Sequence, residues 1–102
     1  MALFIMATRL KGEEAHPTLR LEEKEGRAMR AIKDAGLDVQ WVANYATLGP
    51  YDYIDIFRAV DDETALKVST LVRGVGNAHT EVWGAVEWDR FREMLQELKN
   101  AA

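Results

Sequence analysis

Cysteine is absent from this sequence, and its absence removes several classes of protein at once. Disulfide-stapled scaffolds, thiol catalysis and Cys-rich zinc sites all require it. Proline is scarce, with two residues among 102, and seven residues are glycine, which excludes collagen-like and low-complexity chains. The residues that are present, 48% hydrophobic and 29% charged, have the balance of an ordinary globular protein. We therefore expect a single domain over residues 1–102.

A long apolar run is also lacking. The apolar start of the chain, residues 1–7, is short, and Arg9 and Lys11 follow it. A signal peptide carries its basic residues before the apolar stretch, and a membrane helix needs about 20 apolar residues. A cytoplasmic location without a membrane partner is therefore the expectation. The chain also lacks a large net charge, since its 13 Lys and Arg and 17 Asp and Glu give a net charge of −4. This balance offers no general attraction to nucleic acid.

Hydrophobic residues recur with two different periods along the chain. Alternation, or a run of β-branched and aromatic residues, predicts strands, whereas apolar residues three and four positions apart predict helices. The expected strands cover 2–9, 38–48, 51–60 and 77–86, and the expected helices cover 18–36, 61–76 and 91–98. Asp61 is the expected N-cap of the second helix, and Gly74 and Gly76 are its expected stop. This βαββαβ order with a trailing helix predicts a ferredoxin-like α+β fold, with an antiparallel four-stranded sheet in the order 4-1-3-2.

The first and third strands, at the centre of the expected sheet, are apolar on both alternating sides. In the first strand, Phe4 and Met6 alternate with Leu3 and Ile5. The two main helices would cover one face of the sheet, so the other face needs a cover from another subunit, the C-terminal helix or both. We expect a homodimer or higher homo-oligomer packed sheet to sheet, as in a dimeric α+β barrel, burying about 600–1,000 Å² per chain.

Three segments that occur in the expected order carry a resemblance to a known family. They are TLGPYDYIDI at 47–56, DDETA at 61–65 and GNAHTEV at 76–82. Together they resemble the GYD domain family, whose Gly, Tyr and Asp would be Gly49, Tyr51 and Asp52 in this sequence. The resemblance spans the first strand to the fourth and implies a small ferredoxin-like α+β domain. It implies no particular activity.

Gly49 and Pro50 predict a tight hairpin between the second and third strands. Glycine at the first central turn position permits a positive φ, and proline fits the negative φ required next. Tyr51 and Asp52, beside this turn, could line a ligand pocket at one end of the sheet. We favour a local role, in which Asp52 accepts backbone amide hydrogen bonds and Tyr51 packs across the turn.

Asp55 and His79 are the candidate residues for proton transfer. Alternation along the third strand separates Asp55 from Ile54 and Ile56, which we expect to face the helices. On the opposite face, a covered carboxylate requires an ion pair, a raised pKa or a wet cavity between sheets. His79 lies two residues from Glu81, and this pair could act as acid and base or bind a metal. We favour a plain surface position for His79 on an edge strand. No His-rich spacing exists, so neither a metal nor a cofactor is expected.

Aromatic residues on the strands are candidates for shaping a pocket. Trp41, Tyr45 and Tyr53 are the main ones, with Phe57 and Trp83 beside them. Such residues also dominate ordinary cores and interfaces, which is the interpretation that we favour. RNA-recognition motifs share this topology and carry sheet aromatics. The acidic third strand, YDYIDIF, argues against RNA as a partner.

Two functions remain compatible with these residues. The first is a homo-oligomeric ligand-binding or assembly module, with a small molecule held in a pocket between two sheets. The alternative is a small cofactor-independent enzyme, of the oxygenase or isomerase type, that uses the same cavity. In the second case, Asp55 and His79 would transfer protons inside a pocket shaped by Trp41, Tyr45 and Tyr53.

Overall fold

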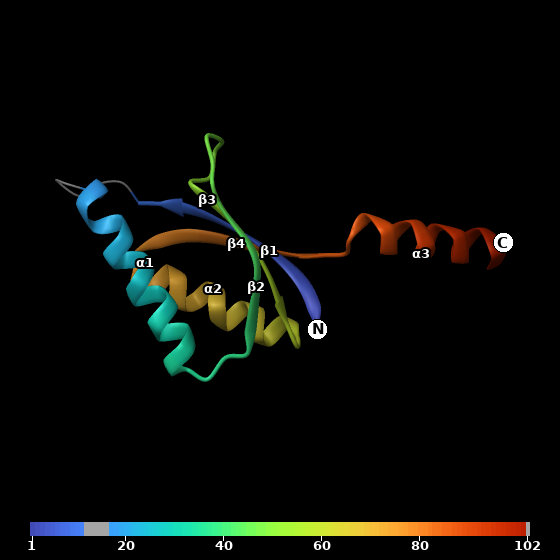
Figure 1. Cartoon of the computed structure of the whole chain (residues 1–102), viewed down its shortest axis with the longest axis horizontal. Coiled ribbons are helices and arrows are strands. Elements are labelled where there is room, and N and C mark those ends of the chain that lie inside the picture. Colours follow the sequence, from blue (N-terminus) through green and yellow to red (C-terminus); the bar gives the residue numbers. More distant parts are fainter. Residues whose placement is uncertain (12–16, 102) are drawn as a thin grey trace.

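The computed structural model describes residues 1–11 and 17–101 as a four-stranded sheet with three helices (Figure 1). The strands are β1 (Ala2–Leu10), β2 (Val39–Ala46), β3 (Tyr53–Ala59) and β4 (Ala78–Ala85). The helices are α1 (Pro17–Asp34), α2 (Asp62–Gly76) and α3 (Trp88–Ala101). The predicted βαββαβ order with a trailing helix is confirmed, and the fold is ferredoxin-like α+β.

The sheet has the strand order β2-β3-β1-β4, with every neighbouring pair antiparallel. This is the predicted order, with β1 and β3 at the centre. The register places Met6 of β1 between Asp55 of β3 and Val82 of β4. Asn44 of β2 lies opposite Asp55 on its other side. These four side chains therefore form one row across the sheet.

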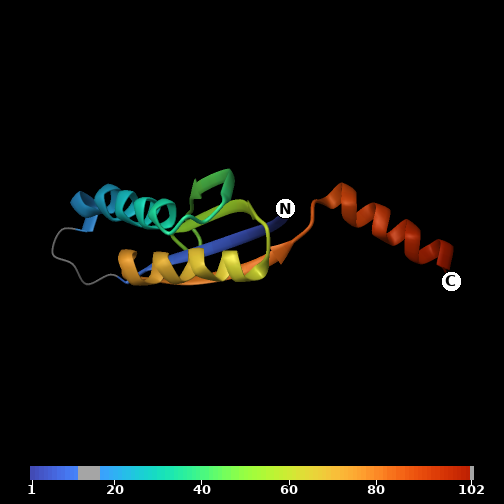
Figure 2. The ribbon, with the colours of Figure 1, turned by 90° about the horizontal axis from the view of Figure 1, so that it is seen from below.

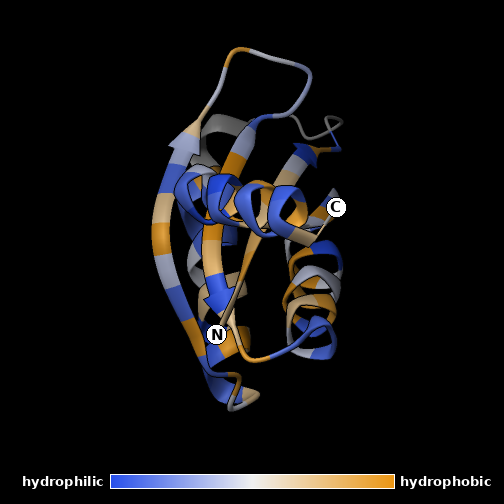
Figure 3. Ribbon diagram, turned by 90° about the vertical axis from the view of Figure 1, so that its right-hand side faces the viewer, coloured by the Kyte–Doolittle hydropathy of each residue, from blue (hydrophilic) through white to orange (hydrophobic). Residues whose placement is uncertain are grey.

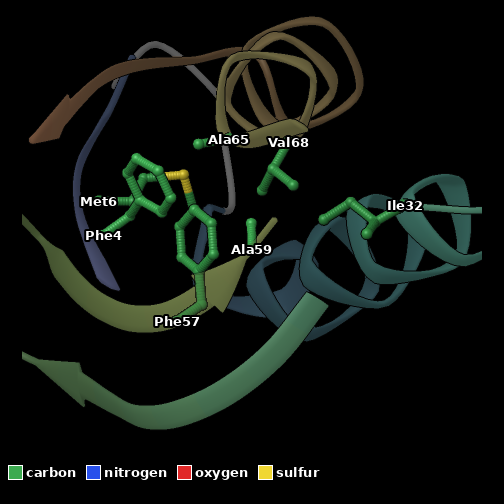
Figure 4. Close-up of a cluster of buried hydrophobic side chains, with 7 residues drawn as sticks. All are labelled: Phe4, Met6, Ile32, Phe57, Ala59, Ala65 and Val68. Atoms are coloured by element: carbon green, nitrogen blue, oxygen red, sulfur yellow. The ribbon is translucent and has the colours of Figure 1, made fainter. Parts of the chain in front are cut away.

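The hydrophobic core lies between the sheet and the two helices α1 and α2, which cover the same face (Figure 2). Its buried side chains converge from four elements, as Figure 4 shows. They are Phe4 and Met6 from β1, Phe57 and Ala59 from β3, Ile32 from α1, and Ala65 and Val68 from α2. Phe4 and Phe57 stack with ring centroids 5.7 Å apart. Burial of this set supplies the main driving force for the fold.

The orientation of β3 is opposite to the prediction. Phe57 is fully buried under the helices, so Asp55 and Tyr53, which share its side of the strand, also face α1 and α2. Ile54 and Ile56 lie on the helix-free face. Alternation divides a strand into two sets of residues, but it does not say which set meets the helices. Here the helices cover the set that combines a large aromatic ring with Ala59, whose small side chain leaves room beneath them.

The ends of α2 follow ordinary capping chemistry. The Asp61 carboxylate accepts hydrogen bonds from the backbone N–H and the hydroxyl of Thr64, at 2.8 and 2.7 Å, which confirms the predicted N-cap. The helix continues through Gly74 and ends at Gly76, the second of the two glycines predicted to stop it. It ends where Asn77 adopts the left-handed conformation, with φ of 49°, and its N–H donates to the carbonyl of Arg73.

The connection between β2 and β3 is wider than the predicted tight hairpin. The strands stop at Ala46 and resume at Tyr53. Gly49 does not have the positive φ that a two-residue turn would need; among the described residues, only Gly36 and Asn77 do. Hydrogen bonds close the wide loop instead, with the N–H of Thr47 donating to the Asp52 carbonyl at 2.9 Å. The predicted second and third strands therefore extend about two residues too far into this loop.

The third helix, α3, extends away from the rest of the protein (Figures 1 and 2). None of its side chains is buried, although hydrophobic and hydrophilic residues alternate along it (Figure 3). The molecule accordingly measures 59 × 32 × 17 Å. Within the ranges that the structure describes, no helix has the length and apolar character needed to cross a membrane.

Candidate functional site

A cavity of about 110 Å³ opens between the N-terminal half of α1 and the helix-covered face of the sheet. Its apolar walls include Met6 of β1, Trp41 of β2 and Ala28 of α1. Its polar lining residues are Thr8, Lys24, Glu25, Asn44, Tyr53 and Asp55. The cavity is therefore a mostly apolar hollow with a few convergent polar groups, as small-molecule sites usually are.

Asp55 is the polar group with the most perturbed environment in this cavity. Among the described residues, no hydrogen bond or ion pair reaches its carboxylate. Burial raises the pKa of Asp55 to about 6, and the negative charge of Glu25 acts in the same direction. The Asp55 carboxyl therefore gains or loses its proton close to neutral pH, which is the property required of a general acid or base.

Three neighbours of Asp55 add hydrogen-bonding capacity to the cavity. The hydroxyl of Thr8 is buried, with 3% of the residue exposed, and it has no hydrogen-bond partner in the described part of the chain. Burial raises the pKa of Tyr53, as do the charges of Asp52, Glu25 and Asp55. Asn44 lies directly across from Asp55 on β2. Neither Thr8 nor Asn44 was predicted as a site residue from the sequence.

A second polar group of residues, the Tyr51 cluster, lies on the helix-free side of the sheet. It consists of Arg9, Tyr51, His79, Glu81 and Trp83. The hydroxyl of Tyr51 donates a hydrogen bond to Glu81. This bond raises the pKa of Tyr51 and lowers the pKa of Glu81. Because the tyrosine lies in the β2–β3 loop and the glutamate lies on β4, the bond ties the loop to the opposite edge of the sheet.

The other members of the Tyr51 cluster surround the phenol ring. The Arg9 guanidinium lies 5.4 Å from the ring centroid, and the Trp83 ring meets it edge-on at 6.3 Å. His79 Nε2 lies 3.8 Å from Glu81 Oε2. The cluster therefore presents a cation, a carboxylate and an imidazole on the same exposed surface.

Asp52 is used by the backbone around the loop. Its carboxylate accepts a hydrogen bond from the N–H of Leu10 at 2.8 Å, and its own N–H donates to the carbonyl of Thr8 at 2.8 Å. These bonds attach the end of β1 to the β2–β3 loop. They are local contacts of the kind predicted for this residue, and one of them uses an oxygen of its carboxylate.

The predicted site residues do not come together in one pocket. Asp55 lines the cavity under α1, whereas His79 lies on the opposite face, next to Thr80, whose hydroxyl turns inward to Ser69 of α2. Trp41 and Tyr53 lie on the side of Asp55. Tyr45 lies on the side of His79 and is 56% exposed. The expectation that Asp55 and His79 converge is wrong, because it rested on the wrong orientation of β3.

The described residues contain no cluster of three or more His, Cys, Asp or Glu that could hold a metal ion. The closest arrangement is the pair formed by His79 and Glu81. Two ligands at the edge of a sheet fall short of the three or four protein ligands usual for zinc. The side chains of the two polar groups offer hydrogen bonding, charge pairing and proton exchange.

Comparison with solved structures supports the fold. A protein from Thermus thermophilus, TTHA0845, is similar with a TM-score of 0.53 and 23% identity, over 85% of this chain and 95% of that one. The Mycobacterium tuberculosis leucine response regulatory protein, LrpA, is similar with a TM-score of 0.54 and 14% identity, over 84% of this chain. The match spans 51% of the length of LrpA. At such identities these similarities show the fold alone.

The sequence itself decides the family. No curated protein matches the chain. The model of the GYD domain family matches residues 4–95, which include most of β1, the whole of β2, β3 and β4, and both α1 and α2. This agrees with the resemblance carried by Gly49, Tyr51 and Asp52. The chain belongs to the GYD domain family.

Proposed function

We propose that this protein is a homo-oligomeric binding module in which two copies pack their helix-free sheet faces together. One observation carries the proposal, namely the apolar surface of that face. Its central strands present Leu3, Ile5, Ile54 and Ile56, each only half-buried within the single chain. Tyr45 and Trp83 extend the patch at 56% and 43% exposure. A continuous apolar surface of this kind on a small protein usually marks an interaction site.

The unpartnered helix α3 supports the same arrangement. Its exposed apolar stripe contains Trp88, Phe91, Leu95 and Leu98. An amphipathic helix gains most of its stability from packing its apolar side against another element. We propose that α3 of each copy covers part of the other copy's sheet. The ion pair between Arg58 and Glu87 supports this, because it holds the start of α3 beside β3 while the helix points outward.

The ligand-binding part of the proposal concerns the Tyr51 cluster. Its position at one end of the helix-free face would place it at the border of a pocket between two packed sheets. The paired Arg9, Tyr51 and Glu81 would offer a small polar molecule both donors and acceptors. The alternative function, a cofactor-independent enzyme, relied on proton transfer between Asp55 and His79. Their positions on opposite faces leave that pair without a shared substrate site.

Solution mass, measured by light scattering at micromolar concentration, tests this proposal. We expect twice the 11.6 kDa of one chain for the native protein. Ile54→Glu should give the mass of a single chain, because a carboxylate in the centre of the contact would lose its hydration. Leu66→Glu is the matched control, since Leu66 is 59% exposed on α2, away from this face.

A second pair of substitutions tests the part assigned to α3. Phe91→Glu combined with Leu95→Glu removes the apolar stripe and should weaken the dimer, while urea denaturation should show that the single chain remains folded. A native protein with the mass of one chain would contradict the proposal, as would an Ile54→Glu variant that dimerises as well as Leu66→Glu.

A further inference from the structure

Two polar groups that lack hydrogen-bond partners among the described residues line the cavity under α1, and of these Thr8 is buried and Asp55 is half-buried. These are the carboxylate of Asp55 and the hydroxyl of Thr8, neither of which has a hydrogen bond within the described residues. Buried polar groups in proteins are nearly always paired, because an unpaired one carries the full cost of desolvation. Two polar groups without partners that face one cavity could both be paired by a ligand with matching polar atoms.

The charges around Asp55 define what kind of group would complete it. The titratable or polar side chains that share the cavity are Thr8 of β1, Asn44 of β2, Tyr53 of β3, and Lys24 and Glu25 of α1. Glu25 opposes ionisation of Asp55, and the pKa of Asp55 is raised although Lys24 also lines the cavity. Among the described residues, no positively charged donor forms a hydrogen bond or ion pair with the Asp55 carboxylate. Such a donor gives a carboxylate its strongest hydrogen bonds.

The rest of the cavity fits a short apolar body. Most of its lining is hydrophobic, including Met6 and Trp41. A volume of about 110 Å³ compares with a cavity of about 150 Å³ that accepts benzene, so about four to six non-hydrogen atoms would fit. Trp41 adds an aromatic ring, which also attracts a cation. A neighbouring hollow of about 240 Å³ shares Glu25, Asn44, Tyr53 and Asp55 with the cavity.

We infer that the cavity under α1 binds a small organic amine in its ammonium form. The charged head lies against Asp55 and Thr8, and the apolar body lies between Met6 and Trp41. This site is separate from the proposed dimer contact, because it lies on the other face of the sheet. A failure to dimerise would leave it intact, and a failure to bind amines would leave the dimer intact.

Titration of the ¹⁵N-labelled protein with n-butylammonium, n-butanol and n-butyrate, followed by NMR at neutral pH, tests the inference. We expect saturable shifts of the backbone amides of Thr8, Asn44 and Asp55 with n-butylammonium at millimolar concentration. Binding of n-butanol should be about tenfold weaker, because it lacks the charge, and n-butyrate should not bind.

Two variants and a control identify the groups responsible. Asp55→Asn should weaken n-butylammonium binding about tenfold, and Thr8→Val, which keeps the shape but removes the hydroxyl, should weaken it about threefold. Asp38→Asn, at an exposed carboxylate outside the cavity, should leave binding unchanged. Equal affinities for n-butylammonium and n-butanol would overturn the inference. So would shifts that do not saturate, or an Asp55→Asn variant that binds as tightly as the native protein.

Discussion

The two faces of the sheet have similar apolar content, yet they differ in what the chain does with them. The covered face holds the closely packed core around Phe57, which is fully buried, and also the cavity with Asp55. The helix-free face holds half-buried isoleucines and the Tyr51 cluster, with no packed layer above them in the part of the chain that is described. Hydrophobicity alone therefore does not tell which face is the core. The covered face is distinguished by side chains of complementary size, which fill the space beneath two helices.

The largest expected contrast between the faces is at two adjacent residues of β3. Phe57→Ala should destabilise the protein by about 3–5 kcal/mol, because it leaves a cavity in the core. Ile56→Ala, on the helix-free face, should cost only about 1 kcal/mol at concentrations low enough to separate the copies. Urea denaturation measures both. If the two substitutions cost the same in the separated chain, the distinction between a packed and an unpacked face is wrong.

A smaller loss of stability is expected from substitution of Asp52, in the β2–β3 loop. Asp52→Ala should destabilise the protein by about 2 kcal/mol, because it leaves the N–H of Leu10 without its carboxylate acceptor. Asp52→Asn keeps an acceptor at the same position and should recover most of that loss. Thermal and urea denaturation of both variants check this. An alanine variant as stable as the native protein would show that the loop is held without this bond.

Removing the charge of Asp55 should stabilise the protein, in contrast to removing the carboxylate of Asp52, because the charge of Asp55 opposes folding. The pKa of about 6 in the folded protein lies above the ordinary 3.8, so between these values the folded chain binds more protons than the unfolded chain. The native protein should therefore lose stability as the pH rises from about 4 to about 6.

Asp55→Asn should remove this loss. We expect a gain of about 1–2 kcal/mol near neutral pH, which is less than the full conversion of the pKa shift because solvent reaches part of the side chain. Below about pH 4 the variant and the native protein should be equally stable. Urea denaturation at both pH values tests this. Glu25→Gln tests whether the charge of Glu25 contributes to the raised pKa of Asp55, since this substitution should lower that pKa. A variant less stable than the native protein near neutral pH would contradict the prediction.

The topology could be predicted from the sequence because each element carries its own local signal. A short run that is apolar on both sides marks β1, helical spacing marks α2 and α3, and Asp61 and Gly36 mark helix ends. Sequence order then leaves few ways to connect four strands with two right-handed crossovers. The left-handed conformation of Asn77 at the end of α2 and the width of the β2–β3 loop were not predictable. Both depend on hydrogen bonds of the particular backbone more than on residue type.

The candidate site could be predicted only in part, and the reason lies in the orientation of β3. The sequence identifies Asp55 as unusual, and a raised pKa is one of the outcomes that it allows. It misassigns the neighbours of Asp55, because it places this residue with His79 instead of Asn44. The antiparallel register could have indicated Asn44, since two polar residues facing each other across a hairpin suggest a shared environment. Thr8 gives no such signal, because its lack of a partner emerges only once the strands are packed.

The short link between β4 and α3 has a consequence for the stoichiometry of the proposed assembly. Only Val86 and Glu87 separate the two elements, and Glu87 is tied to Arg58, so α3 has little freedom to swing back over its own strands. In a two-fold pair, α3 of each copy packs on the sheet of the other copy. Both helix-free sheet faces are then covered. No free position then exists for a third molecule, so this geometry would prevent growth into fibres.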